Sequence, residues 1–390
     1  MEIPDETFVE IIEGKTKVLV PKKSITDKVP PKEPAFFNPK ARVNRDYSVI
    51  AYSSFLKKFV GPKIFLEGLT GVGIRGLRVA NELQIEKVII NDLNPTALKM
   101  AKYSAQLNKL KNIEFSEMEV CRFLSKFSKK DKRGSITDID PFGSPAPFFD
   151  CGIRATMHGG ILSTTATDLQ VLNGLYQNAC KRKYGGIPIR VEYGNEMAIR
   201  LMLGCLRMVA GRIGVEIVPL FAESNMHYYR IYVQVLIRQD QKENIGYILH
   251  CKNCGDRRIV LEQYYECELC KSKLSIGGPL WIDKIFDKEF VENMILEIPE
   301  VSVDKVCEKT LQKCLKESEM PGIYFTLDEI AAKMKSSPPK LEDAIKNLQK
   351  NGYIASPTSF CPTGFRTNAN IKEIIDVFSG LACKPQADIV

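Results

Sequence analysis

Short apolar runs alternate with amphipathic segments along the chain from residue 63 to residue 168. The runs are typical of buried strands, whereas the segments between them repeat their apolar positions at helical spacing. We expect strands at 63–67, 86–92, 112–117, 134–140 and 159–168, with helices at 76–84, 94–110, 119–127 and 146–157. Strand and helix units alternating at this length predict an α/β fold, in which helices cover both faces of a parallel sheet.

Two further apolar runs, at 215–224 and 227–238, follow a predicted helix at 195–212. Because only a few residues separate the two runs, they cannot be joined by a crossover helix and should pair as antiparallel strands. The expected sheet is therefore parallel and ends in one antiparallel hairpin.

The remaining chain predicts smaller units. Residues 1–34 indicate a short β-rich entry, with a strand at 16–21, and the polar segment 238–246 is typical of a linker. Near the C-terminal end of the chain, a helix is expected at 303–316. A capping box of Thr326 and Glu329 marks the start of another helix, and Gly352 ends the helix that follows it. Helix, turn, helix and a strand pair indicate a winged-helix-like module at about 300–380. We expect two domains, 1–244 and 245–390, the second of α+β type.

Composition describes a soluble globular protein, since 44% of its 390 residues are hydrophobic and 26% are charged. No apolar run has membrane-spanning length, and the acidic first residues indicate no targeting segment, so we expect a cytoplasmic protein. In that compartment the 12 cysteines should be thiols and metal ligands rather than disulfides. A net charge of +8 suits a polyanionic partner, although basic surfaces also serve solubility.

A glycine-rich turn follows the strand at 63–67. Gly71, Gly73 and Gly76 satisfy G-x-G-x-x-G, and Asp92 follows at the end of the next strand. This pattern suits a nicotinamide dinucleotide, and it equally suits S-adenosylmethionine, whose ribose hydroxyls a carboxylate can hold. The antiparallel hairpin favours the second reading, because it is typical of class I (Rossmann-like) methyltransferases and not of dehydrogenases. Arg75 would then lie near the cofactor's carboxylate, unless it is an exposed arginine on a helix face.

The segment DIDPFGSPAPF, residues 138–148, contains the candidate catalytic group. Asp140 ends a strand because Pro141 cannot continue the ladder, and ligands of parallel α/β sheets bind at that edge. Phe142 supplies a flat surface for a flat substrate. The same residues also describe an ordinary type I turn. Polar residues 164–168 end the neighbouring strand and should reach the same edge.

Two cysteine pairs predict a zinc ribbon at 247–275, although the pairs lie slightly closer together in the sequence than is usual for zinc ribbons. Cys251 and Cys254 form one C-x-x-C knuckle, Cys267 and Cys270 form the other, and 12 residues separate them. Four thiolates leave no open position on a tetrahedral ion, so this Zn²⁺ would be structural. The alternative is four unliganded thiols. The other cysteines are expected to be packing residues.

The sequence resembles the tRNA (guanine-26-N2)-dimethyltransferase family over nearly its whole length. The resemblance is carried by FFNPKARVNRD, LTGVGIRGLR, IINDLNP, DPFGSPAPF, LSTTATD, KRKYGGIPIR and GGPLW. It implies two methyl transfers to the exocyclic N2 of guanine 26 in tRNA. It also implies S-adenosylmethionine bound by Arg45, Arg75, Asp92, Glu119 and Val120, although Glu119-Val120 stands where the family usually has Asp-Ala.

The chemistry required fits these residues. The exocyclic amine of guanine gains positive charge as it takes a methyl group, so a carboxylate such as Asp140 would stabilise that charge and accept a proton. Phe36 and Phe142 are candidates for stacking on the extruded purine, although Phe36 could instead be core.

Basic residues offer candidate phosphate contacts. Clusters at 129–133 and 181–183 are expected near the active edge, and a C-terminal face would comprise Lys333, Lys335, Lys340, Lys346, Lys350 and Arg366. A solvated helix surface looks similar. We expect a monomer as the default. The competing interpretations are a nicotinamide-dependent oxidoreductase and a non-catalytic RNA-binding adaptor.

Overall fold

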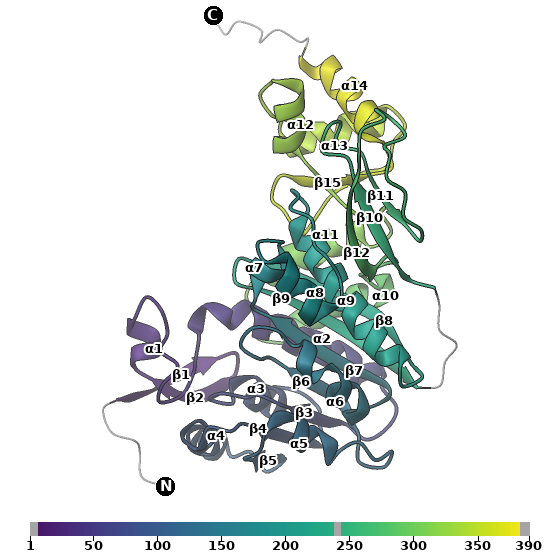
Figure 1. The fold of residues 1–390 in the computed structure, drawn as a ribbon. Coiled ribbons are helices and arrows are strands. Elements are labelled where there is room, and N and C mark those ends of the chain that lie inside the picture. The colour runs from purple at the N-terminus through teal and green to yellow at the C-terminus, as the bar shows by residue number, and fades with distance from the viewer. Residues whose placement is uncertain (1–6, 238–242, 383–390) are drawn as a thin grey trace, which may run out of the picture.

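The computed structural model describes residues 7–237 and 243–382, and a seven-stranded sheet lies at the centre of its larger part (Figure 1). The strand order is β5-β4-β3-β6-β7-β9-β8. Strands β3 to β7 pair in parallel, whereas β9 is antiparallel to both β7 and β8. The predicted sheet with its terminal antiparallel hairpin is confirmed. The strands are Ile64–Glu67 (β3), Lys87–Asn91 (β4), Ile113–Ser116 (β5), Gly134–Ile139 (β6), Thr156–Ala166 (β7), Val215–Asn225 (β8) and Tyr228–Ile237 (β9).

The strand order reverses direction at β3, with β4 on one side and β6 on the other. Because crossovers between parallel strands are right-handed, this reversal sends α3 and α4 to one face of the sheet and α5 and α6 to the opposite face. Helix α2 packs beside α3, and α9 packs on α6 and on the β8–β9 hairpin. The helices are Arg42–Lys58 (α2), Ile74–Glu82 (α3), Pro95–Leu107 (α4), Val120–Ser125 (α5), Phe149–Ala155 (α6), Leu169–Leu172 (α7), Gln177–Tyr184 (α8) and Gly194–Gly211 (α9).

An N-terminal hairpin covers one end of this sheet. The predicted strand Thr16–Pro21 (β2) is present and pairs with Phe8–Glu13 (β1), which the sequence pattern did not predict, and Lys23–Thr26 (α1) follows. Val18 and Val20 of β2 pack with Leu77 of α3 and Met100 of α4 in one apolar cluster. The hairpin therefore closes the α3–α4 face of the sheet.

The C-terminal part contains two small antiparallel sheets. The first has the order β11-β10-β12, and the second has the order β13-β15-β14 and packs with α12, α13 and α14. The second unit has the elements of the predicted winged-helix-like module, including the capping box of Thr326 and Glu329. Helix α10 was not predicted. The elements are Ile245–His250 (β10), Arg257–Val260 (β11), Ser275–Trp281 (β12), Lys288–Glu297 (α10), Val306–Glu317 (α11), Phe325–Thr326 (β13), Leu327–Met334 (α12), Leu341–Lys350 (α13), Ala355–Pro357 (β14), Gly364–Thr367 (β15) and Ile371–Ala382 (α14).

One hydrophobic core continues across the predicted domain boundary at residue 244. Leu280 and Trp281 of β12, Val291 of α10 and Leu311 of α11 belong to the same buried cluster as the seven-stranded sheet. Residues 238–242 of the predicted linker lie outside the described residues. The two-domain division stays a prediction, and any boundary at 244 would cut through shared apolar packing.

Two cysteines correct the expectation that the cysteines outside the knuckles are packing thiols. Cys121 of α5 and Cys151 of α6 form a disulfide, with their Cα atoms 5.5 Å apart. The two helices follow different strands and meet because both lie on the same face of the sheet. Their proximity therefore depends on the strand crossovers, and the spacing of 30 residues carries no signal for it.

Candidate active site

A cavity of about 620 Å³ opens at the carboxyl edge of the central sheet. It lies where β3 has neighbours running to both sides, the point at which open α/β sheets bind ligands. The ends of β3, β4, β6 and β7 reach it, as do the segment before α2 and the β8–β9 turn. The predicted residues that line it are Phe36, Arg45, Arg75, Asp92, Asp140 and Phe142.

The glycine-rich turn is held by the acid that was predicted with it. Gly71 and Gly73 have φ values of +53° and +85°, and a Cβ at Gly73 would lie 2.7 Å from the Cβ of Ala101. The carboxylate of Asp92 accepts a hydrogen bond from the Gly71 amide at 2.7 Å and one from the Asn94 amide at 2.9 Å. The turn is therefore a fixed surface with close backbone approach, which fits an adenosine-type cofactor.

Asp140 is bound to Arg75, whose guanidinium also donates to Ser48 at 2.7 Å and to Asn44 at 3.0 Å. Arg75 is buried, so the alternative of an exposed arginine on a helix face is wrong. A second acid, Asp138, lies 3.4 Å from the same guanidinium and is also paired with Arg230. Burial alone would raise the pKa of Asp138, but Arg230 and Arg75 hold it below its ordinary value. The catalytic candidate is thus the outermost member of a buried series of alternating charges.

Arg45 also lines the cavity with its charge already paired. Its guanidinium donates to the carboxylate of Glu13 at 2.7 and 2.6 Å and to the carbonyl of Asn38 at 3.1 Å. Both arginines assigned to the cofactor therefore have acidic partners inside the protein. Their direct contact with a cofactor stays a prediction.

Phe36 and Phe142 lie against each other at the mouth of the cavity. Their ring centroids are 4.8 Å apart and the ring planes meet at 80°. Phe142 is 59% exposed, and the ammonium of Lys32 lies 4.9 Å from the centre of its ring. A purine held between these two rings would have to separate them, which the exposure of Phe142 permits.

Glu119 and Val120 are not among the residues that line the cavity. The Glu119 carboxylate accepts hydrogen bonds from the amides of Cys121 and Arg122 and so caps α5. A Cβ at Gly68 would lie 2.7 Å from Val120, so the α5 start packs against the loop after β3. The cofactor role assigned to this pair stays a prediction.

Sequence reasoning missed several residues of the cavity wall. Glu67 ends β3, and burial raises its pKa to about 8. His227 and Tyr228 come from the β8–β9 turn, and Tyr228 donates to Glu223 at 2.9 Å. An acid that closes a buried strand was a usable signal for Glu67. The turn residues had no signal, because their approach depends on how the hairpin folds back. Polar residues at 164–168 do reach this edge, through Thr165 and Thr167.

Two expectations about basic residues are wrong. The cluster at 129–133 precedes β6, so it lies at the amino edge of the sheet, a strand length away from Asp140. Arg366 is buried and paired with Glu196 and Glu317, so it belongs to the interior and not to a phosphate-contacting face. Lys335, Lys346 and Lys350 are exposed.

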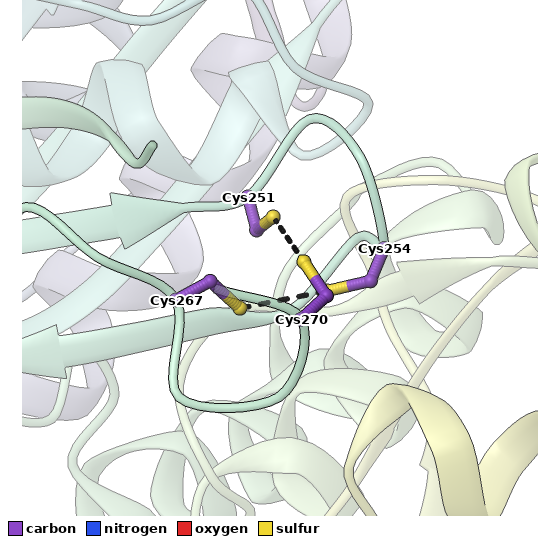
Figure 2. A group of neighbouring side chains, drawn as sticks. All are labelled: Cys251, Cys254, Cys267 and Cys270. Atoms are coloured by element: carbon purple, nitrogen blue, oxygen red, sulfur yellow. Dashed lines mark hydrogen bonds between the residues drawn. The ribbon is translucent and has the colours of Figure 1, made fainter. Parts of the chain in front are cut away.

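The four cysteines of the two knuckles converge next to β10 and β12 (Figure 2). Their sulfurs lie within 4.8 Å of one another, with Cys251 and Cys270 at 3.4 Å and Cys254 and Cys267 at 3.6 Å. Tetrahedral zinc with sulfur ligands would require sulfur separations of about 3.8 Å. Hydrogen bonds from Ser272 and from Asn253 lower the pKa of Cys270 to about 5. The donor set and its dimensions fit a structural zinc ion.

A sheet in this order, with its glycine-rich turn and Asp92 beside Asp140 at the carboxyl edge, defines a Rossmann-like methyltransferase. The sequence model of the family described as N2,N2-dimethylguanosine tRNA methyltransferase matches residues 14–379, and the chain belongs to that family. Among the residues described, 7–237 and 243–382, no helix is long and apolar enough to cross a membrane.

Similar proteins cover almost the whole chain. The tRNA (guanine(26)-N(2))-dimethyltransferase of Methanobrevibacter smithii is 33% identical over 392 residues, which cover 97% of this chain and 99% of the relative. The protein of the same name from Methanococcus maripaludis strain C7 is 34% identical over 380 residues, with coverage of 95% and 97%. The solved structure of Trm1 from Pyrococcus horikoshii with S-adenosyl-L-methionine is 29% identical, has a TM-score of 0.83, and is matched over 95% of this chain and 99% of that chain.

Proposed function

We propose that this protein transfers one methyl group and then a second from S-adenosylmethionine to the exocyclic N2 of guanine 26 in tRNA. The observation that carries the proposal is the position of Asp140. This acid follows β6 directly and lines the same cavity as the glycine-rich turn and the exposed ring of Phe142. Membership of the family indicates which reaction is catalysed. The cavity contains candidate residues for cofactor binding, for stacking on the base and for accepting a proton.

The cofactor end of the cavity is formed by the turn at Gly71–Gly73 and by Asp92. Bound there, S-adenosylmethionine would supply an electrophilic methyl group on its sulfonium. Asp92 would hold the ribose hydroxyls, and Arg45, Arg75, Glu119 and Val120 are the further candidates for cofactor contacts.

At the substrate end, Phe36 and Phe142 would hold the purine by its faces once it leaves the tRNA stack. Asp140 would then accept a hydrogen bond from the N2 amine and stabilise the positive charge that develops on it. Arg75 holds Asp140 in place, and its donors also go to Ser48 and Asn44, which fix the guanidinium itself. A second transfer needs the same contacts with the first methyl group turned aside.

The cysteine cluster is proposed to bind one structural Zn²⁺ as part of a zinc ribbon. The ligands Cys251, Cys254, Cys267 and Cys270 would close a tetrahedral site, and none of the four lines the cavity. We retain the proposals of a cytoplasmic location and a monomer. Neither the nicotinamide-dependent oxidoreductase nor the non-catalytic adaptor is favoured by an observation on this chain.

The direct test is nucleoside analysis of unmodified tRNA after incubation with the protein and S-adenosylmethionine. We expect N2-methylguanosine to appear first and N2,N2-dimethylguanosine to replace it, both at position 26. Equilibrium binding should detect S-adenosylhomocysteine and not NAD. Unmodified tRNA at saturating protein would overturn the proposal, and a tRNA in which guanine 26 is replaced by adenine is the matched control.

A further inference from the structure

The segment that contains Asp140 and Phe142 is anchored at two points. Asp140 is held from inside by Arg75, as described above. Three residues on, Gly143 is held by Thr167, which follows the end of β7. The Thr167 hydroxyl accepts a hydrogen bond from the Gly143 amide at 2.6 Å, and the Thr167 amide donates to the Gly143 carbonyl at 2.8 Å. Phe142 therefore lies on a span of backbone fixed at both ends.

Gly143 needs such an anchor because its backbone is in the left-handed region, with φ at +81°. A Cβ at this position would have no neighbour within 4 Å, so packing does not hold the residue. Its two hydrogen bonds to Thr167 are the interactions that fix this peptide among the described contacts. Losing the hydroxyl would free the amide to water and leave the Gly143 peptide bound to Thr167 by a single hydrogen bond.

The position of Thr167 is fixed by the contacts of the residue that follows it. Asp168, the next residue, accepts hydrogen bonds from the Tyr184 hydroxyl at 2.7 Å and from the Lys183 ammonium at 2.9 Å. Tyr184 is fully buried, so helix α8 fixes the position from which Thr167 reaches the loop. The hydroxyl also lines the cavity without belonging to any predicted catalytic group.

We propose that Thr167 is a positioning residue, whose hydroxyl holds the loop 140–143 so that Asp140 and the ring of Phe142 meet the guanine in reactive geometry. The expected effect on kcat rests on the proposed function. Thr167 acts through Gly143, and its effect falls on turnover more than on cofactor affinity.

The test compares Thr167→Val, which keeps the shape and removes the hydroxyl, with Thr167→Ser, which keeps the hydroxyl. We expect Thr167→Val to lower kcat about 10- to 100-fold, the loss typical of small misplacements of reacting groups. Affinity for S-adenosylhomocysteine and the thermal midpoint should stay at wild-type values, and Thr167→Ser should restore most of the turnover. Thr26→Val on α1 is the matched control, because this side chain is exposed and its hydroxyl bonds only Lys22 and Asp27 among the described bonds.

Gly143→Ala tests the same loop from its other side. Because no atom opposes the added Cβ, its effect comes from the left-handed backbone alone, and it should lower kcat with the same sparing of cofactor affinity. If Thr167→Val fails to fold, this variant decides the question. Equal kcat for wild type and the folded variant, or equal losses in Thr167→Val and Thr167→Ser, would overturn the inference.

Amide hydrogen exchange separates this inference from the proposed function. In Thr167→Val the Gly143 amide should exchange faster than in wild type, with no tRNA or cofactor present. If the wild-type protein turns over normally and Thr167→Val has the same kcat, only the positioning role is overturned. If the wild-type protein shows no turnover, the proposed function is overturned. Unchanged exchange of the Gly143 amide in Thr167→Val would in that case overturn the anchoring as well.

Discussion

Asp140 lies at one end of a group of four buried or half-buried charged residues. Asp138 and Asp140 alternate with Arg230 and Arg75, so the formal charges of the group sum to zero. Because each buried charge has a partner, the group avoids the large cost of an isolated ion. Asp140 is the most exposed of the four, at 29%, and Arg75 keeps Asp138 as a counter-ion, shared with Arg230, when Asp140 is removed.

Asp140→Ala is therefore expected to fold and to bind S-adenosylhomocysteine, but to lose about 100- to 10,000-fold in kcat. Single-turnover methyl transfer to tRNA measures the loss. Asp150→Ala is the matched control, because that acid follows on α6, is 56% exposed and pairs only with Arg154 among the described ion pairs. Turnover at the wild-type rate in the Asp140 variant would remove the residue from the mechanism.

A second residue-scale prediction concerns pH. Burial raises the pKa of Glu223 from 4.5 to about 8, and Arg230 opposes this only in part. The folded protein therefore holds a proton that the unfolded chain releases above pH 4.5, so this group's contribution to stability is lost as pH rises through about 8. Glu67 acts with the same sign.

Glu223→Gln should make the fall in unfolding free energy between pH 5.5 and 8 less steep, by at most about 1.4 kcal/mol per pH unit. Urea unfolding at three pH values measures the slope. Glu262→Gln, at an exposed position, is the matched control. An unchanged slope in Glu223→Gln would show that the folded protein does not hold this proton.

At the scale of elements, the β11-β10-β12 sheet depends on its two knuckles. Cys251 and Cys254 follow β10, while Cys267 and Cys270 precede β12, and the apolar cluster beside them is small. A unit with so few buried side chains needs a further link between its loops. A bound ion at the four sulfurs would supply that link.

Cys251→Ser and Cys267→Ser should each lower the thermal midpoint and the zinc content, and leave methyl transfer by the folded fraction near the wild-type rate. Metal analysis of natively purified protein should give one zinc per chain. Cys361→Ser is the matched control, because that thiol lies outside the cluster. Absence of zinc, together with equal stability of all three variants, would refute the site.

At the scale of the whole molecule, Glu196 connects the catalytic sheet to the C-terminal module. It lies on α9 and is paired with Arg200 on the same helix and with Arg366 on β15. Burial alone would raise the pKa of Glu196, but Arg366 and Arg200 lower it to about 2. The amide of Ile323 also donates to Glu196 at 2.9 Å. One acid thus joins segments that are far apart in the sequence.

Glu196→Gln should destabilise the whole chain by about 3 kcal/mol or more, because it leaves the buried Arg200 guanidinium without its acidic partner and Arg366 with Glu317 alone. Urea unfolding, followed both by the fluorescence of Trp281 and by cofactor binding, measures the change. The two probes should report one transition. Glu192→Gln, at an exposed position before α9, is the matched control, and a local effect seen by only one probe would contradict the shared core.

Recognition of tRNA is expected to involve both parts of the molecule. Reversing the charges of Lys335, Lys346 and Lys350 to glutamate should weaken tRNA binding and flatten its salt dependence, since fewer phosphates would be neutralised. Reversing Lys129, Lys130 and Lys132, at the amino edge of the sheet, makes the same change in net charge and should weaken binding much less. Wild-type affinity for tRNA in the folded Lys335, Lys346 and Lys350 variant would show that this lysine face is only a solvated surface and would limit recognition to other surfaces.

Sequence patterns were enough to predict the strands and helices of the central sheet, its antiparallel hairpin and the local motifs. They were enough because hydrophobic periodicity, the turn at Gly71–Gly73, the Thr326 capping box and the cysteine knuckles are all properties of nearby residues. Asp92 and Asp140 were found for the same reason, since each acid follows a strand whose carboxyl end must reach the ligand-binding edge.

Which charges pair and which surfaces are free became known from the packing of the folded chain. Arg366 looked like part of a basic face, but the packing of β15 on α9 and α11 buries it between two acids. The cluster at 129–133 looked close to Asp140, but the cluster precedes β6 and Asp140 follows it, so the length of the strand separates them. The partners Arg75–Asp140, Thr167–Gly143 and Cys121–Cys151 lie 65, 24 and 30 residues apart. Such contacts depend on chain crossovers and side-chain packing, which no local pattern encodes.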